Sequence, residues 1–366
     1  MKFTVIGAGN GGRAFAAYLA SKGFSVTLYN RSYTRIYDIW KTGGIQAEGE
    51  IEGFFPLDII TQDLRLAVKD ADVILIVTPA FAHKSLARKM AKYLRDGQII
   101  VLNPGRTFGS IEFLREIERI RGKIPIFVGE TQTLLFTCRA LPGNGVRILK
   151  IKDEVQFATF PEKYTMIVCD ILNEAFPQLV PVENYLELTL NNIGMLLHPA
   201  ISLLNAGTID CGKPLKFYRE GASPHVFEVL ENIEFELNKI YLKLGLKQLK
   251  FYEWAKKSYN VDASNIYDAI QQINAYANID APKELITRYF TEDVPTGLVP
   301  MASLAEFLDI DTPTINSIIH LSSIICGIDF KEEGRTIEKL KIEKYIKEYL
   351  GEVEYIPERI TEIGEY

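Results

Sequence analysis

His198 is the side chain of this sequence best suited to move a proton, because histidine gains and loses its charge near neutral pH. It lies in the stretch 191–207, NNIGMLLHPAISLLNAG, whose apolar residues have helical spacing. Pro199 follows it and has no backbone N–H. We therefore predict that the helix kinks or breaks at His198 and presents the histidine at a bend.

Polar and small residues recur on one face of this stretch, because positions three to four apart share a face of a helix. They form a stripe on a surface that is otherwise Leu, Ile and Met: Asn191, Gly194 or Met195, His198, Ser202 and Asn205. We interpret the stripe as the floor of a ligand site, with Asn192, Ser202 and Asn205 as substrate-binding candidates. The alternative is a core histidine whose ring is satisfied by a neighbouring carbonyl.

A second group of reactive side chains lies at 287–300, where two prolines and a glycine frame a loop among apolar residues. Arg288 could bind a substrate carboxylate through two parallel hydrogen bonds. Asp293, if buried, could hold a histidine ring and stabilise its protonated form. The loop therefore offers a substrate anchor and a partner for His198; the alternative is an Arg–Asp pair that only closes the loop.

The first elements of the chain have the pattern of a dinucleotide site. An apolar strand pattern at 2–6 runs into GAGNGG at 7–12 and then into a helical pattern at 14–19, with another strand pattern at 25–29. In this G-x-G-x-x-G spacing the glycines allow a tight turn and let backbone N–H groups approach a pyrophosphate at the helix N-terminus. We predict that a dinucleotide binds at Gly7, Gly9, Asn10 and Gly12; the alternative is a merely structural glycine turn.

The end of the second strand indicates which dinucleotide is preferred. An NAD-selective protein usually has Asp or Glu there for the ribose 2′-hydroxyl, whereas this chain has Asn30, Arg31 and Ser32. An arginine with small polar neighbours can pair with a 2′-phosphate, so NADP(H) is favoured over NAD(H). The alternative for Arg31 is a solvated surface charge. Thr78 and Pro79, which end the apolar strand 73–77, are further cofactor-binding candidates.

Strand and helix patterns alternate through the first part of the chain, which predicts an α/β fold with a doubly wound parallel sheet. Further strands are predicted at 99–102, 126–128, 147–151 and 154–159, and Gln132, in the loop after the second of these, is another substrate-binding candidate. After Pro161 only helical patterns follow, at 164–175, 185–205, 224–244, 251–258, 266–273, 283–289 and 313–326. We predict a dinucleotide-binding domain at 1–165 and an all-α substrate and catalytic domain at 166–366.

Composition and charge favour a small-molecule partner. The net charge of −6 comes without a long acidic or basic run, which argues against nucleic acid or an anionic membrane as the main partner. No apolar run reaches about 18 residues and the first strand begins at Lys2, so we expect a cytoplasmic protein without a signal peptide. The sequence leaves open whether the protein forms a homodimer. Four cysteines without a C-x-x-C pair predict reduced thiols and no metal site: Cys138, Cys169, Cys211 and Cys326.

These segments together resemble the opine dehydrogenases of the octopine/nopaline dehydrogenase type, and the resemblance covers nearly the whole chain. It rests on five pieces: Gly7 to Gly12, Asn103 to Thr107, Glu130 to Arg139 (ETQTLLFTCR), Asn192 to Gly207 with His198-Pro199-Ala200, and Arg288 to Pro300. The resemblance implies an N-terminal Rossmann domain joined to an all-helical domain, with substrates held in the cleft between them.

The same resemblance implies an activity and the residues that carry it. The family joins an α-keto acid, commonly pyruvate, to the amine of an amino acid by NADH- or NADPH-dependent reductive condensation. Its catalytic histidine corresponds to His198, the aspartate partner to Asp293, and the substrate-binding arginine to Arg288. The pair Asn30-Arg31 departs from family members that prefer NADH, so the cofactor preference is our own inference from the residues.

Two alternatives to an opine dehydrogenase stay open: a reductase with a different reaction, and a dinucleotide-binding protein that catalyses no reaction. Glycerol-3-phosphate dehydrogenases and ketopantoate reductases are similar at the N-terminus, but they rely on a lysine in the helical domain. The comparable helix here has Asn191-Asn192 and supplies a histidine one or two turns later. The remaining hypotheses are a related hydroxy-acid reductase and a dinucleotide-sensing protein without turnover. The polar stripe around His198 counts against the sensing protein.

Overall fold

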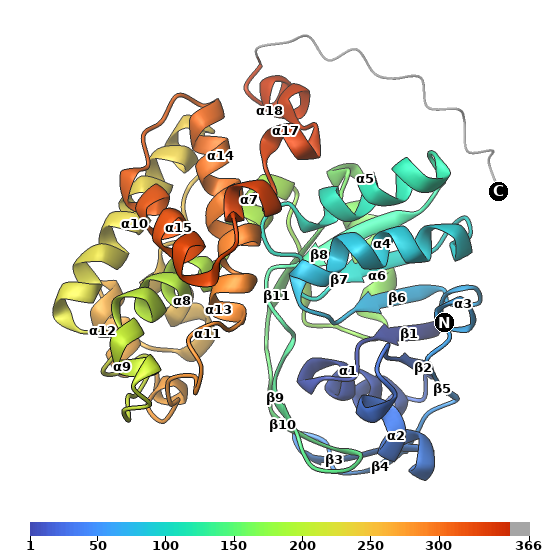
Figure 1. The fold of residues 1–366 in the computed structure, drawn as a ribbon. Coiled ribbons are helices and arrows are strands. Elements are labelled where there is room, and N and C mark those ends of the chain that lie inside the picture. Colours follow the sequence, from blue (N-terminus) through green and yellow to red (C-terminus); the bar gives the residue numbers. More distant parts are fainter. Residues whose placement is uncertain (352–366) are drawn as a thin grey trace.

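The protein has two parts of different architecture, which lie side by side in the computed structural model (Figure 1). The structure describes residues 1–351. The first part is built on β-sheets covered by helices, and the second consists of helices and their connections. The predicted order, an α/β part followed by an all-α part, is confirmed.

The main sheet is the platform of the first part. Its strand order is β12-β11-β8-β7-β6-β1-β2-β5, and all neighbours are parallel except β8 and β11. The central strands β6 and β7 are buried on both faces, as the continuous apolar runs VILI and IIVL predict. The strand bounds are β1 Lys2–Ile6, β2 Ser25–Tyr29, β5 Ile59–Thr61, β6 Val73–Ile76, β7 Ile99–Leu102, β8 Phe127–Thr131, β11 Val155–Phe160 and β12 Leu179–Pro181.

Helix α1 is buried along most of its length because sheets lie on two of its sides. It contacts β1 and β2 of the main sheet and all strands of a smaller sheet with the order β4-β3-β10-β9. Phe15 of α1 packs edge-on against Phe136 of β9 and Phe176, at ring-centroid distances of 4.9 and 5.6 Å. The bounds of the smaller sheet are β3 Gly44–Gly49, β4 Gly53–Pro56, β9 Phe136–Ala140 and β10 Gly145–Ile151.

The smaller sheet was not predicted, and it separates two segments that the sequence pattern treated alike. The predicted strands 147–151 and 154–159 are both present, but β10 joins the smaller sheet and β11 joins the main one. A sequence pattern gives the length of a strand but not its partner, because pairing depends on contacts between distant segments. The helices of this part are α1 Asn10–Ser21, α2 Tyr33–Thr42, α3 Leu64–Val68, α4 His83–Met90, α5 Gly109–Arg121 and α6 Thr165–Asn173.

The helical part follows most of the predicted ranges. The predicted helix 313–326 is α15, whereas the one predicted at 283–289 begins only at Arg288, after the Thr287 hydroxyl that accepts a hydrogen bond from the Tyr289 N–H. The bounds are α7 Tyr185–Leu190, α8 Ile193–Leu204, α9 Ala206–Asp210, α10 Pro224–Lys243, α11 Phe251–Tyr259, α12 Ile266–Gln272, α13 Arg288–Thr291, α14 Val299–Phe307, α15 Pro313–Cys326, α16 Phe330–Glu333, α17 Ile337–Leu340 and α18 Glu343–Tyr349.

The break predicted at His198 is wrong, because α8 continues through Pro199 to Leu204. The chain leaves helical geometry earlier, at Asn191 and Asn192, which separate α7 from α8. A proline inside a helix costs about 3 kcal/mol, and burial of large apolar side chains offsets it at about 1.5–3 kcal/mol each. Since most of α8 is buried in the core of the helical part, packing outweighs the missing hydrogen bond.

The sheet part extends beyond the predicted boundary at residue 165. Helix α6 contributes Cys169 and Leu172 to the core beneath the main sheet, and β12 pairs with β11. The change from sheet to helices therefore comes after Pro181. The predicted boundary lies too early because a three-residue edge strand is too short to give a recognisable sequence pattern. Residues 352–366 of the predicted second domain lie outside the described part of the chain.

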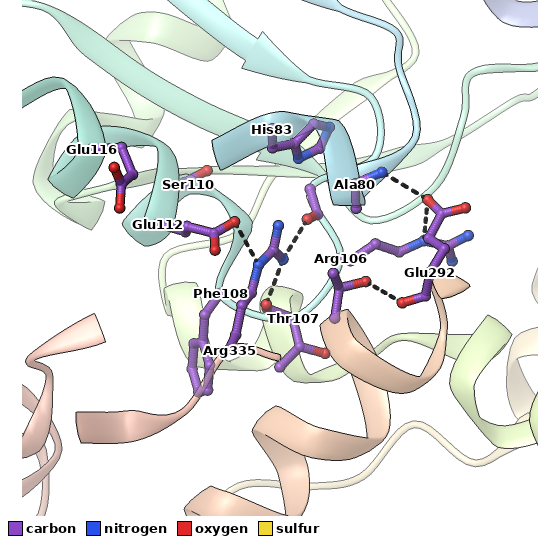
Figure 2. A network of polar contacts seen from close by, with 12 residues as sticks. Ala80, His83, Arg106, Thr107, Phe108, Ser110, Glu112, Glu116, Glu292 and Arg335 are labelled. Carbon is purple, nitrogen blue, oxygen red and sulfur yellow. Dashed lines mark hydrogen bonds and ion pairs between the residues drawn. The ribbon is translucent and has the colours of Figure 1, made fainter. Parts of the chain in front are cut away.

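The C-terminal segment returns to the sheet part through a buried arginine (Figures 1 and 2). Arg335, 2% exposed, donates from Nη1 to the carbonyls of Gly105 (3.0 Å) and Thr107 (2.8 Å). Its Nε donates to Glu112 at the start of α5 over 2.9 Å. Arg335 of the helical part thus holds the loop that follows β7, and Glu112 of the sheet part holds Arg335 in place.

His83, the first residue of α4, is completely buried and contacts the loop that follows β6. Its Nε2 lies 3.2 Å from the Thr78 carbonyl, and its ring meets Phe113 edge-on. Burial, reinforced by the charges of Arg335 and Arg106, lowers the pKa of His83 from 6.5 to about 3. The folded protein therefore holds this imidazole neutral in mildly acidic solution, whereas the unfolded chain protonates it.

We predict that His83 makes the protein less stable as the pH falls from about 6.5 towards 3. In this window the unfolded state binds the extra proton, so the stability present above pH 6.5 is lost progressively. The loss between pH 7 and pH 5 should be about 2 kcal/mol smaller in His83→Phe than in the wild type. Denaturant unfolding at both pH values measures it, with the exposed His225→Phe as a control. Equal losses in wild type and His83→Phe would contradict the assignment.

Candidate active site

His198 and Asp293 form a hydrogen-bonded pair that joins α8 to the segment after α13. The distance from His198 Nδ1 to Asp293 Oδ2 is 2.7 Å, and the two residues are 95 positions apart in the chain. The carboxylate is 1% exposed and the imidazole 14%. Because an ionised carboxylate can only accept, Nδ1 carries the hydrogen of this bond, and Nε2 is left to other partners. The predicted pairing of these two residues is present in the structure.

Arg106 completes this pair, and sequence reasoning did not single it out. Its Nη2 lies 3.5 Å from Asp293 Oδ1, and its Nη1 donates to Asn192 Oδ1 at 3.1 Å. Burial raises the pKa of Asp293, but the charges of Arg106 and His198 outweigh burial and hold it below its usual value. The carboxylate therefore stays ionised in the interior. The signal that could have revealed Arg106 is its position in the polar loop at the carboxyl end of β7.

The charged cluster needs a residue without a side chain at position 194. A Cβ on Gly194 would lie 2.7 Å from Asp293 Oδ1 and 2.8 Å from Arg106 Nη1. Both distances are shorter than ordinary contacts, so any larger residue would push the two charges apart. Gly194, predicted only as part of the stripe, is thus where α8 makes room for the ion pair.

Glu292 connects the cluster to the loop that follows β6, as Figure 2 shows. Its Oε1 accepts a hydrogen bond from the Ala80 N–H at 3.0 Å and lies 3.6 Å from Arg106 Nε. Ala80 directly follows Thr78 and Pro79, both predicted to bind the cofactor. Neighbouring carboxylates on the helical part therefore contact two loops at the carboxyl edge of the sheet.

Aromatic rings surround the imidazole, and no sequence signal predicted them. The Tyr218 hydroxyl lies 2.9 Å from His198 Nε2, and the Tyr289 ring stacks on the imidazole at a centroid distance of 4.3 Å. Tyr276 stacks on Tyr218 at 4.1 Å, and Phe217 stacks on Tyr289 at 4.8 Å. The histidine thus lies among aromatic side chains, with the Tyr218 hydroxyl at Nε2 and the Tyr289 ring stacked on the imidazole.

The predicted substrate-binding residues separate into different environments. Asn192 lies in the charged cluster, and Arg288, exposed at the start of α13, is close enough for its charge to lower the pKa of Asp293. Within residues 1–351 the Arg288 guanidinium has no hydrogen-bond or ion-pair partner. Gln132 is half-buried just beyond the end of β8.

The far end of the predicted stripe serves the fold. The Asn205 amide donates to the carbonyls of Ile201 (2.8 Å) and Gly221 (2.9 Å), which ties the end of α8 to the next loop. The Ser202 hydroxyl is fully buried, and no hydrogen-bond partner for it is found in the described part of the chain. The structure therefore brings Asn192 and His198 into one site and leaves Ser202 and Asn205 outside the charged cluster.

The glycine turn has the shape that a pyrophosphate requires. Gly7 has φ +115°, and a Cβ on Gly12 would lie 1.8 Å from the Gly7 carbonyl oxygen, so α1 can approach the strand only with glycine there. A Cβ on Gly9 would meet nothing within 4 Å, which leaves open space beside the start of α1. Asn10, its first residue, accepts a hydrogen bond from the Ala140 N–H. These residues fit a dinucleotide whose phosphates face the α1 N-terminus.

The end of β2 presents the residues predicted to choose between cofactors. Asn30 accepts from the Ala8 N–H at 3.2 Å and donates to the Ser32 carbonyl at 3.0 Å, which fixes this turn against the glycine loop. Arg31 is exposed beside it. Beyond β6, which β1 separates from β2, the Thr78 hydroxyl is buried and makes no hydrogen bond to any described residue. A positive charge and small polar groups therefore lie at the end of β2, where Rossmann folds hold the adenosine ribose of a dinucleotide.

Two features bear on other classes of site. Among residues 1–351, no group of three or more His, Cys, Asp or Glu side chains could hold a metal ion. No helix in the described part of the chain has the length and apolar composition needed to cross a membrane.

Both parts of the chain match known families. Residues 2–117 match the N-terminal domain of NAD-dependent glycerol-3-phosphate dehydrogenase, and residues 181–326 match the α-helical domain of NAD/NADP octopine/nopaline dehydrogenase. The second match begins at Pro181, where the structure changes from sheet to helices. The sequence resemblance to opine dehydrogenases is confirmed.

Individual relatives agree over nearly the whole length. The opine dehydrogenase of Arthrobacter sp. strain 1C is 42% identical over 339 residues, which cover 92% of this chain and 94% of that protein. A structure of octopine dehydrogenase with NADH and L-arginine matches with a TM-score of 0.78 and 20% identity, over 98% of this chain and all of that one. A yersinopine dehydrogenase bound to NADP⁺ matches at 0.70 and 14% identity, over 96% and 99%. The chain therefore belongs to the opine dehydrogenase family and is an NAD(P)-dependent oxidoreductase.

Proposed function

We propose that this protein joins an α-keto acid, such as pyruvate, to the amino group of an amino acid by NAD(P)H-dependent reductive condensation. The observation that carries the proposal is the buried pair of His198 and Asp293, 2.7 Å apart, within a cluster that contacts the loops after β6 and β7. The family supports the same reaction, since the 42% identical relative is an opine dehydrogenase. The octopine dehydrogenase of matching fold was solved with NADH and L-arginine.

The reaction needs a proton donor that works near neutral pH. When an amine adds to a ketone, a hydroxyl group must leave as water before the carbon can be reduced, and a reduced nicotinamide supplies the hydride. His198 is the proton donor in our proposal, because Asp293 holds its Nδ1–H and leaves Nε2 for transfer. Arg106 keeps Asp293 ionised, so the carboxylate can stabilise the protonated imidazole.

Arg288 is the anchor for a substrate carboxylate in this scheme. Both proposed substrates carry a carboxylate, and a guanidinium binds that group through two parallel hydrogen bonds. Arg106 is already committed to Asp293, Glu292 and Asn192, whereas Arg288 has no such partner within residues 1–351. Gln132 and Asn192 are the further polar candidates, at the sheet edge and in the charged cluster respectively.

The direct test is a screen of NADPH and NADH oxidation by the purified protein. Pyruvate, 2-oxobutyrate and 2-oxoglutarate are each combined with a panel of amino acids, and each keto acid is also tested alone. We expect oxidation only when both substrates are present, with a secondary amine as the product. Oxidation with a keto acid alone would instead identify a hydroxy-acid dehydrogenase, and binding of the dinucleotide without turnover would identify a sensing protein.

The first residue prediction concerns the proton donor. His198→Ala should lower turnover by about 10²–10⁴ while the dinucleotide still binds, because general acid catalysis is typically worth that much. Asp293→Asn should be damaging as well, since an uncharged amide cannot stabilise the imidazolium and its NH2 group favours the wrong ring tautomer. Steady-state rates and fluorescence titration with NADPH measure the two effects. A folded His198→Ala protein with wild-type turnover would remove His198 from the mechanism.

The second concerns the carboxylate anchor. Arg288→Lys should raise the KM of at least one substrate by about tenfold or more and leave cofactor affinity nearly unchanged, because lysine keeps the charge but loses the paired hydrogen bonds. The exposed Lys283→Arg, in the segment before α13, is the matched control. An unchanged KM for both the keto acid and the amino acid would return Arg288 to a surface role.

The third concerns the cofactor. We propose that NADP(H) is preferred, because Arg31 can reach a 2′-phosphate and Asn30 adds no opposing charge. Arg31→Ala should reduce the ratio of NADPH to NADH efficiency by about tenfold or more, since charge-assisted hydrogen bonds contribute about 1.5–3 kcal/mol. Lys41→Ala, an exposed cation near the end of α2, should leave the ratio unchanged. A wild-type protein with higher kcat/KM for NADH would show this preference to be wrong.

A further inference from the structure

We propose that the Tyr218 hydroxyl passes the proton from His198 to the substrate, so that the acid of this enzyme is a histidine–tyrosine relay. The inference rests on the proposed function, in which His198 is the acid. It adds a residue that touches the reacting group. It also explains why the Tyr218 hydroxyl occupies Nε2, the imidazole nitrogen from which the proton would leave.

Both nitrogens of the His198 ring are bonded within the protein. Asp293 Oδ2 lies 2.7 Å from Nδ1, and the Tyr218 hydroxyl lies 2.9 Å from Nε2. A substrate that took its proton directly from Nε2 would have to displace Tyr218. A substrate that took it from the tyrosine would leave the hydrogen bond in place, because a phenol can accept one hydrogen while it donates another.

Tyr218 is not free to swing away. It is 6% exposed, and its ring stacks on Tyr276 at 4.1 Å with planes 14° apart, while Phe217 meets it edge-on at 5.0 Å. The segment that carries it is bound to the chain after α12, where the Phe217 N–H donates to the Ile279 carbonyl at 2.8 Å. Displacing the hydroxyl would break this packing, so relay is the less costly route.

The environment keeps the phenol protonated. Burial raises the pKa of Tyr218 well above 10, and Tyr289 and Asp293 add to the effect, whereas Arg288 opposes it. A neutral phenol can pass on a proton and recover its own, which a phenolate could not do near neutral pH. The ionisable groups around the His198–Tyr218 pair are Asp293, Arg106, Arg288, Tyr289, Tyr276 and Tyr259.

The proposed substrate anchor is close enough for its charge to act on the Tyr218 hydroxyl. The charges of Arg288 and Arg106 both act on Tyr218 and Asp293, and of the two only Arg288 has a guanidinium without a hydrogen-bond or ion-pair partner within residues 1–351. Tyr289 covers a face of the imidazole, which limits direct approach to the ring from that side. In our proposal, a carboxylate held by Arg288 brings the rest of the substrate to the Tyr218 hydroxyl before it reaches His198.

The relay step balances without another reactant. In the adduct of amine and keto acid, the C–O bond breaks as the nitrogen lone pair forms a C=N bond, and the departing oxygen takes the Tyr218 hydrogen. The phenol oxygen takes the Nε2 hydrogen of the protonated His198 in the same step. Water and an iminium ion result, the imidazole is neutral, and Tyr218 ends as it began.

The test is Tyr218→Phe, which removes the relay and little else. In single-turnover NADPH oxidation we expect the rate to fall by about tenfold to a hundredfold, with both substrate KM values changed by less than about threefold. Tyr241→Phe, which removes a buried hydroxyl elsewhere in the helical part, is the matched control and should retain the wild-type rate. A Tyr218→Phe rate within about twofold of the wild type would overturn the relay.

A second measurement does not depend on how the variant folds. The wild-type single-turnover rate should bend when plotted against the deuterium fraction of the solvent, as expected for two protons in flight, and a straight line would count against the relay. Replacement of Tyr218 by the more acidic 3-fluorotyrosine should change the rate, whereas a purely structural phenol would not respond. Loss of activity in His198→Ala with a normal Tyr218→Phe would reject the relay and retain the proposed function. Full activity in His198→Ala would reject the relay and the role of His198 as the acid, whereas the proposed reaction itself would stand.

Discussion

The structure depends on one buried ionic contact, that of Asp293 with His198 and Arg106. A lone carboxylate at 1% exposure would be protonated or expelled, because burial disfavours its charged form. Here an arginine from the sheet part and a histidine from the helical part compensate the charge together. The two parts must therefore meet in one arrangement for the carboxylate to remain ionised. The contact that supports the chemistry also specifies how the parts are joined.

The position of Arg106 is itself secured from a distance. The Arg106 backbone lies in the left-handed region, at φ 63°, a conformation that residues other than glycine rarely adopt. Arg335 donates to the carbonyls of the residues on either side, Gly105 and Thr107. The connection between α16 and α17 thus acts on the site without touching a reacting group. Arg335 orders the loop, the loop positions Arg106, and Arg106 keeps Asp293 charged. A change at Arg335 should be felt first through that carboxylate.

What the sequence could predict depended on how local the cause was. The glycine turn and the buried strands are local patterns, so Gly7, Gly12 and β6 were found, and a family resemblance identified His198 and Asp293 as partners. Arg106 and Tyr218 were missed because their importance comes from contacts across 86 and 20 positions, which no spacing encodes. Pro199 misled for a related reason: a local rule predicted a break, and burial of α8 overrode it. The smaller sheet was not predicted as a unit because β3 and β10, which join its two local strand pairs, pair across about a hundred positions.

The two halves of the proposed reaction are built in different ways. The dinucleotide side relies on backbone shape, in which the absence of a Cβ at Gly12 lets α1 approach the strand and Gly9 leaves room in front of it. The proton side relies on side chains whose charges are compensated only when buried together. Gly194 shows that these strategies meet, because its missing Cβ creates the space in which Asp293 and Arg106 come together. Backbone shape tolerates changes in distant residues, whereas the compensated cluster does not, so substitutions at the domain junction should impair proton transfer before they impair dinucleotide binding.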